Sequence, residues 1–259
     1  MVKLAVAGGT GTAGRMVVAE SIRRGYETRS LSLHTPAAND PARVSGAEYL
    51  VADAGSGQGL AEAVAGVDVL VETLDGKAGA ALQAMPDTTR TLLNAAEAAG
   101  VKRAVLLSIV NSDQSDYAYY QVQAQRAEVY RRTGLATTVV YATQFHDLIA
   151  SIFSAGARVG LIPVFSRVSF QPIATADAAR ALVDAAVAEE SPETVTVGGP
   201  EVLTMRQLAE QWKIVRRPKA LIVPMPLPGS FGKFLRDGRN LVPGHAYGTV
   251  TFSDWLESS

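Results

Sequence analysis

The 259-residue sequence has no cysteine and only three histidines, His34, His146 and His245. The absence of cysteine excludes disulfide bonds, thiolate metal ligands and a cysteine nucleophile. Without a His-x-x-x-His pair, and with scattered carboxylates, the chain is expected to hold no metal. No stretch approaches the roughly 20 apolar residues of a membrane helix, and the N-terminus leads straight into a strand-like run rather than a leader. We therefore expect a cytoplasmic protein with no membrane partner.

Neither sign of charge dominates, with 24 Lys and Arg against 25 Asp and Glu. No basic run or basic stripe interleaved with aromatic residues is present, so we expect no nucleic-acid partner. The sequence also lacks the Gly-x-Ser-x-Gly pattern of serine hydrolases. The remaining expectation is an enzyme or binding protein that acts on a small molecule.

Short apolar runs alternate with Ala-rich amphipathic segments over the first 190 residues or so. This alternation predicts βαβ units, and hence an α/β fold with a Rossmann-like, doubly wound parallel sheet. The expected strands are 4–7, 28–33, 49–51, 69–72, 104–108 and 137–141, and the expected helices are 14–24, 59–65, 87–99, 119–132 and 176–188. We expect a dinucleotide-binding core in residues 1–150, and the remaining core elements with a small C-terminal substrate lobe in 151–259. Thr204 is expected to cap a helix that begins at Met205.

A glycine-rich turn lies between the first strand and the first helix, in the sequence Gly8-Gly-Thr-Gly-Thr-Ala-Gly-Arg15. Glycines allow a tight turn and a close approach of the backbone to phosphates, and the following helix offers free N–H groups to an anion. The turn predicts a bound nicotinamide dinucleotide; a glycine turn without a nucleotide is the alternative. The expected cofactor contacts in this turn are Gly8, Thr10, Gly11, Thr12, Ala13, Gly14 and Arg15.

The end of the second strand distinguishes NAD from NADP, because an acidic residue there binds the ribose hydroxyls and repels a 2′-phosphate. Residues 28–36 contain no acid. Arg15 and His34 could face a phosphate, which favours NADP(H) over NAD(H), although both could be solvated loop residues. After the third strand, Asp53 could accept hydrogen bonds from the adenine amino group, or it could cap a turn.

Together these features resemble the NmrA-like branch of the atypical short-chain dehydrogenase/reductases. The resemblance rests on the G-x-x-G-x-x-G turn and on the segments 66–70, 94–110, 134–147, 170–173 and 177–182. It implies an NAD(P)-binding Rossmann fold over nearly the whole chain. Fold transfers between such relatives more safely than activity does.

The broader superfamily uses a Tyr-x-x-x-Lys pair on a helix, with a Ser or Thr after the preceding strand. The matching residues here are Tyr119 and, before it, Ser108, but Gln123 stands where the lysine is expected. Glutamine can bind a ribose hydroxyl, yet it has no charge with which to lower the pKa of a phenol. The departure leaves three possibilities: a reductase with another proton donor, a substrate that supplies its own acidity, or a nucleotide-binding protein without turnover.

His146 is the best-placed alternative proton donor, because its segment follows a strand and so lies at the carboxyl rim of the sheet. A structural, hydrogen-bonded histidine is the alternative. Asn111, Gln144 and Phe165 are expected substrate contacts, although Asn111 also fits a polar surface loop.

The favoured hypothesis is an NAD(P)-dependent oxidoreductase that transfers hydride to a small organic carbonyl or activated double bond. One rival is an NmrA-like redox sensor or regulator without turnover. Another is a non-redox cyclase or isomerase on the same fold. The helices expected at 87–99 and 119–132 could pair two subunits in a homodimer.

Overall fold

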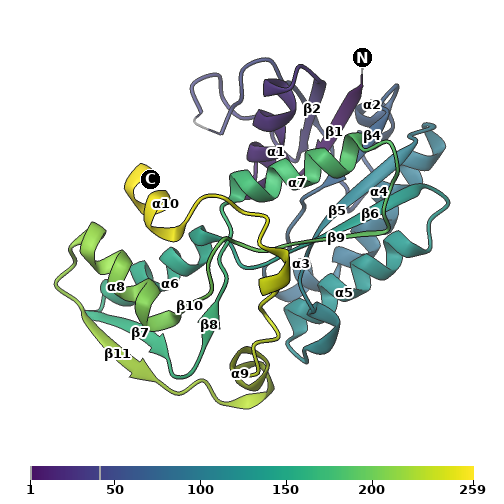
Figure 1. Ribbon diagram of the computed structural model, residues 1–259. Helices are drawn as coiled ribbons and strands as arrows, with labels where there is room; N and C mark the ends of the chain where they lie inside the picture. Colours follow the sequence, from purple (N-terminus) through teal and green to yellow (C-terminus); the bar gives the residue numbers. More distant parts are fainter. Residues whose placement is uncertain (1, 41) are drawn as a thin grey trace. The chain divides into compact units, whose positions relative to one another are not determined.

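The computed structural model describes residues 2–40 and 42–259 (Figure 1). Two compact units share the chain, and each is built from three segments. The first contains Met1–Ser108, Ala118–Val140 and Ala179–Val195, and the second contains Ile109–Tyr117, Tyr141–Ala178 and Thr196–Ser259. The units therefore alternate along the sequence.

A seven-stranded sheet is the centre of the fold, in the order β3-β2-β1-β4-β5-β6-β9. The pairs β2–β3, β1–β2, β1–β4 and β4–β5 run parallel. Its strands are β1 (Lys3–Ala7), β2 (Glu27–Ser32), β3 (Glu48–Val51), β4 (Val69–Glu72), β5 (Arg103–Ile109), β6 (Ala136–Ala142) and β9 (Thr194–Val197). The predicted doubly wound fold and all six predicted strands are confirmed. Because β1 lies between β2 and β4, the strand order reverses beside β1, which is where open α/β sheets bind ligands.

Helices flank the sheet (Figure 1). They are α1 (Thr12–Arg23), α2 (Leu60–Val64), α3 (Gly79–Gln83), α4 (Met85–Ala98), α5 (Ala118–Arg131) and α7 (Thr175–Val187). The five predicted helices are confirmed to within two residues at each end. The five-residue α3 was not predicted. Leu4, Ala5 and Val6 of β1 are fully buried, as expected for a central strand covered on both faces.

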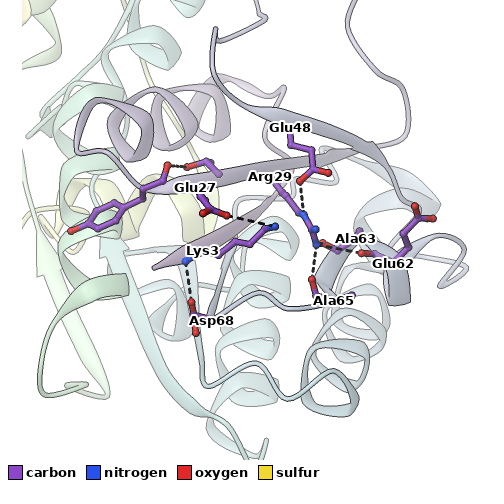
Figure 2. Close-up of polar contacts among 10 residues, drawn as sticks. Lys3, Glu27, Arg29, Glu48, Glu62, Ala63, Ala65 and Asp68 are labelled. Carbon is purple, nitrogen blue, oxygen red and sulfur yellow. Dashed lines mark hydrogen bonds and ion pairs between the residues drawn. The ribbon is translucent and has the colours of Figure 1, made fainter. Parts of the chain in front are cut away.

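Arg29 of β2 closes the C-terminal end of α2 (Figure 2). Its Nη1 donates to the backbone oxygens of Ala63 at 3.1 Å and Ala65 at 2.8 Å, and its Nε donates to Glu48 at 2.7 Å. A cation at the C-terminus of a helix satisfies carbonyls that have no partner within the helix and complements its dipole. One arginine therefore ties α2 to strands β2 and β3.

The second unit holds two small sheets and four helices. β7 (Leu161–Phe165) pairs in parallel with β11 (Leu221–Met225), and β8 (Ser169–Phe170) pairs antiparallel with β10 (Leu203–Thr204). The helices are α6 (His146–Ala157), α8 (Met205–Arg216), α9 (Gly229–Arg236) and α10 (Phe252–Ser258). The predicted Thr204 cap is confirmed, since its hydroxyl accepts from the backbone N–H of Gln207 at 3.2 Å. Within residues 2–40 and 42–259, no helix has the length and apolarity to cross a membrane.

Candidate functional site

The glycine turn follows β1 and ends at the start of α1. Gly8 has a φ of +81°, a left-handed conformation that favours glycine. Gly11 is the N-cap of α1 and supplies no side-chain cap. The first N–H groups of a helix have no acceptor within it, so this end of α1 is suited to an anion. The residues predicted to contact the dinucleotide, Gly8 and Thr10 to Arg15, thus form the turn after the central strand β1 and the first residues of α1.

The turn packs closely against the loop that follows β4. A Cβ on Gly14 would lie 2.1 Å from the carbonyl oxygen of Gly8 and 2.6 Å from the hydroxyl of Thr73. A Cβ on Gly8 would come within 3.1 Å of the backbone of Thr73 and Leu74. Only glycine fits this crossing, because the backbone of Gly8 and the side chain of Thr73 already occupy the space that a Cβ on Gly14 would need.

Gly9 is a further required glycine that the sequence did not identify. Its Cβ would lie 2.4 Å from the hydroxyl of Ser30 on β2. The predicted spacing used Gly8, Gly11 and Gly14, and nothing in the sequence tells which residue of a neighbouring strand approaches Gly9. Two adjacent glycines were the available signal.

The end of β2 carries no carboxylate, as the sequence shows. Arg15 and His34 are both exposed. Their predicted contact with a 2′-phosphate stays a prediction. Asp53 forms a turn: its carboxylate accepts from the N–H of Gly55 and the hydroxyl of Ser56, both at 2.8 Å. These two bonds, the one from Ser56 first, lower the pKa of Asp53, so the turn-capping alternative describes its contacts.

Tyr119 lies at the second position of α5, and its hydroxyl donates to the carboxylate of Asp75 at 2.9 Å. Asp75 belongs to the loop after β4, two residues beyond Thr73. Burial of the ring and the negative charge of Asp75 raise the pKa of Tyr119, while Arg126 acts weakly in the opposite direction. This is the reverse of the shift that an acid–base tyrosine needs.

Gln123 occupies the position of the missing lysine and is buried. Its side-chain oxygen accepts from Arg126 at 2.8 Å. Arg126 in turn forms an ion pair with Glu72 at 2.8 Å, in which the two side chains are 1% and 0% exposed. Thr89 completes the cluster by donating to Glu72 at 2.8 Å. The predicted contact of Gln123 with a cofactor ribose stays a prediction, and its oxygen is engaged in the core.

Ser108 lies near the end of β5 and is 3% exposed. Within the described residues, its hydroxyl oxygen has no hydrogen-bond partner. A buried hydroxyl without a partner carries an energetic cost, which a ligand oxygen at this position would relieve. The position agrees with the predicted role, which stays a prediction.

His146 belongs to the second unit and is the first residue of α6. Its Nε2 lies 3.0 Å from the carbonyl oxygen of Val250, and a carbonyl can only accept, so Nε2 carries the proton. The ring packs against both Phe252 and Trp255, with centroids 5.5 and 5.6 Å away, and is fully buried. These contacts match the structural alternative, in which the histidine anchors the C-terminal segment.

The burial of His146 predicts a pH dependence of stability. Burial lowers its pKa below the ordinary 6.5. As the pH falls below about 6.5, the unfolded chain therefore binds more protons than the folded protein does. Stability is therefore fully present above this pH and declines as the pH drops toward the lowered pKa. Urea midpoints measured between pH 5 and 8 should show this decline, and the His146→Gln variant should lose most of it. An equal change of the urea midpoint with pH in the wild-type protein and in His146→Gln would contradict the role given to His146.

The other expected substrate contacts also belong to the second unit. Asn111 has a φ of 51°, and its amide donates to the carbonyl of Arg239 at 2.7 Å. Gln144 is 7% exposed, and its backbone oxygen accepts from Ile173 at 3.0 Å. Phe165 ends β7 and is partly buried. Their contact with a substrate stays a prediction.

A family model described as NAD(P)H-binding matches residues 8–188. No match is found among curated proteins. Among solved structures, the chain is similar to an NADPH-dependent quinone oxidoreductase from Escherichia coli in complex with NADPH, at 19% identity and a TM-score of 0.79, over 98% of this chain and 99% of that one. It is also similar to a short-chain dehydrogenase/reductase superfamily protein from Agrobacterium tumefaciens with bound NAD, at 19% identity and a TM-score of 0.75, over 99% and 95%. A UDP-glucose 4-epimerase from Thermotoga maritima matches at 15% identity and a TM-score of 0.77, over 99% and 96%.

Proposed function

Because the chain belongs to the NAD(P)H-binding family, we propose that it is an oxidoreductase that transfers hydride between a nicotinamide dinucleotide and a small organic carbonyl or activated double bond. The observation that carries the proposal is the glycine turn at the reversal of strand order. There, Gly8 and Gly14 allow the turn to pack against the loop after β4, and Gly11 leaves the N-terminus of α1 without a side-chain cap. The free N–H groups and the partial positive charge of this helix end suit a pyrophosphate.

The residues of the turn would hold the pyrophosphate through backbone N–H groups, and the dinucleotide would supply or accept the hydride. NADP(H) is the favoured form, because residues 28–36 contain no carboxylate that would repel a 2′-phosphate. Arg15 and His34, both exposed, would contact that phosphate. Ser108, whose buried hydroxyl lacks a partner within the described residues, would bind the substrate oxygen.

Titration calorimetry with NADPH, NADP⁺, NADH and NAD⁺ tests the cofactor assignment. In the Gly11→Asp variant, a carboxylate would face the pyrophosphate, and we expect binding to fall by about 100-fold or more, as for an unpaired like charge in a binding site. Gly11→Ala is the matched control. Gly11 has a φ of −75°, and an added Cβ would meet only the oxygen of Gly8 at 3.3 Å, so binding should fall less than about fivefold.

Turnover is then tested by following oxidation of the bound form of NAD(P)H with quinones, enones and aldehydes. The quinone oxidoreductase among the structural neighbours makes a quinone the first acceptor to try. Substrate-dependent loss of NAD(P)H would support the proposal. Tight binding with no consumption by any acceptor would instead favour a regulator without turnover, and absence of binding would overturn the cofactor assignment.

A further inference from the structure

The pair formed by Asp75 and Tyr119 carries an inference about the substrate. We propose that Asp75 keeps the Tyr119 hydroxyl protonated and engaged as a hydrogen-bond donor, so that this hydroxyl does not give its proton to a substrate. The site then lacks a protein acid, and it reduces acceptors whose reduced oxygen needs no proton from the protein, namely quinones. The inference rests on the proposed function, because it assumes hydride transfer at this site. It makes Asp75 a positioning residue that acts through Tyr119.

The geometry fixes the direction of the phenol. The ring of Tyr119 packs against a small cluster of buried side chains, formed by Leu82, Met85 and Val122, together with Leu74. Leu74, which directly precedes Asp75, packs against the same cluster, so this cluster holds both the ring and the loop after β4. The hydrogen bond of 2.9 Å therefore joins two groups that packing has already brought together.

The charges around the phenol favour its protonated form. Asp75 is the nearest anion, and its charge and hydrogen bond add to burial in raising the pKa of Tyr119. Arg126 lowers the pKa of Tyr119, and Tyr120 raises it. The charge of Arg126 is largely balanced by Glu72, 2.8 Å away in the core. Gln123, one turn along α5 from Tyr119, contributes no charge.

The proton balance then separates two substrate classes. When hydride adds to a quinone, NAD(P)H becomes NAD(P)⁺ and the product is a hydroquinone monoanion, whose conjugate acid resembles a phenol with a pKa of about 10. Such an anion takes its second proton from water. Hydride addition to an aldehyde forms an alkoxide, with a basicity near that of hydroxide, for which the conjugate acid has a pKa of about 15.7. The aldehyde needs a protein acid in the transition state, and this is worth about 10²- to 10⁴-fold in rate.

The protonation state of Tyr119 is measurable without cofactor or substrate. We would label the tyrosine Cζ carbons with ¹³C, record NMR spectra from pH 7 to 11, and assign Tyr119 from the Tyr119→Phe variant. The Tyr119 resonance should show no ionisation at a pH where exposed tyrosines titrate, near about 10. Ionisation of Tyr119 below pH 10 would overturn the inference and leave the proposed function intact.

The kinetic experiment uses 1,4-naphthoquinone and 2-naphthaldehyde as probes of similar size, with NADPH. Asp75→Asn removes the charge and keeps a hydrogen-bond acceptor. It should raise the aldehyde-to-quinone ratio of kcat/KM by about fivefold or more, the effect of one nearby charge at a partly exposed site. Glu62→Gln is the control. It makes the same chemical change at an exposed carboxylate on α2, whose backbone lies beside Arg29 of β2 (Figure 2), and should leave the ratio within about twofold.

Two kinetic outcomes would overturn the inference while hydride transfer itself stands. One is an unchanged ratio in Asp75→Asn. The other is a loss of aldehyde reduction of more than about 100-fold in Tyr119→Phe, since this would identify Tyr119 as the acid of the native protein. If neither probe consumes NADPH and calorimetry detects no dinucleotide binding, the proposed function fails and the inference fails with it.

Discussion

Replacing Glu72 by glutamine is expected to lower the free energy of unfolding by about 3–5 kcal/mol, the cost of leaving a buried charge without its partner. Arg126 is 1% exposed, and its Nη2 lies 2.8 Å from the Glu72 carboxylate. Glutamine keeps the size and an acceptor oxygen but removes the charge. The guanidinium would then remain in the core with only neutral acceptors.

Urea unfolding measures this loss, and two variants control it. Glu128→Gln removes a carboxylate that also pairs with two arginines, Arg131 at the end of α5 and Arg132 just after it, but is 42% exposed, so its cost should stay below about 1 kcal/mol. The double variant Glu72→Leu, Arg126→Met removes both charges and should recover at least half of the lost stability, because apolar side chains of similar size often replace a buried ion pair well. A cost of less than about 1 kcal/mol for Glu72→Gln would mean that water or a shifted side chain reaches Arg126.

The ion pair also bears on the site. Gln123 and Arg126 follow Tyr119 at intervals of four and three residues along α5, so the three lie on one face of the helix. Arg126 joins α5 to Glu72 at the end of β4, and Asp75 follows β4 by three residues. The same strand end thus anchors the helix through Glu72 and orients the phenol through Asp75. We expect Glu72→Gln to loosen the contact between Tyr119 and Asp75 as well as to destabilise the unit.

The sequence predicted the sheet because local patterns determine it. The apolar run of β1, the glycines after it and the helix start at Thr12 are contiguous, so their roles follow from spacing alone. The contacts of Tyr119 do not, because Asp75 is 44 residues away along the chain. Likewise Arg126 and Glu72 are 54 residues apart, and neither residue has a local feature that marks it as one of a buried pair. Such partners are fixed only when helices pack on the sheet.

His146 shows a different limit. The sequence placed it after a strand, which was right, and made it a candidate proton donor at the carboxyl rim of the sheet, whereas the structure buries it. The residues that bury it come from the last helix, α10, and from Val250. A segment about 100 residues later in the chain therefore converts a candidate proton donor into an anchor. Position after a strand indicates where a residue lies in the sheet, but not what covers it.

The Gly14→Ala variant should abolish dinucleotide binding, by about 100-fold or more, and lower stability by about 1–3 kcal/mol, the cost of overpacking a tight site. The added Cβ would lie 2.1 Å from the Gly8 oxygen, so either α1 or the glycine turn must move. Movement of either one displaces the N–H groups that a pyrophosphate would use.

Calorimetry with NADPH and urea unfolding measure the two effects, and Gly11→Ala, in the same turn, should show neither at comparable size. The double variant Gly14→Ala, Thr73→Ala separates the two contacts of the new Cβ. Thr73 contributes a side-chain oxygen at 2.6 Å, which alanine removes, whereas the oxygen of Gly8 belongs to the backbone and stays. We therefore expect the second substitution to restore little binding. Full recovery would show that the hydroxyl of Thr73, rather than the crossing of the two backbones, requires glycine at position 14.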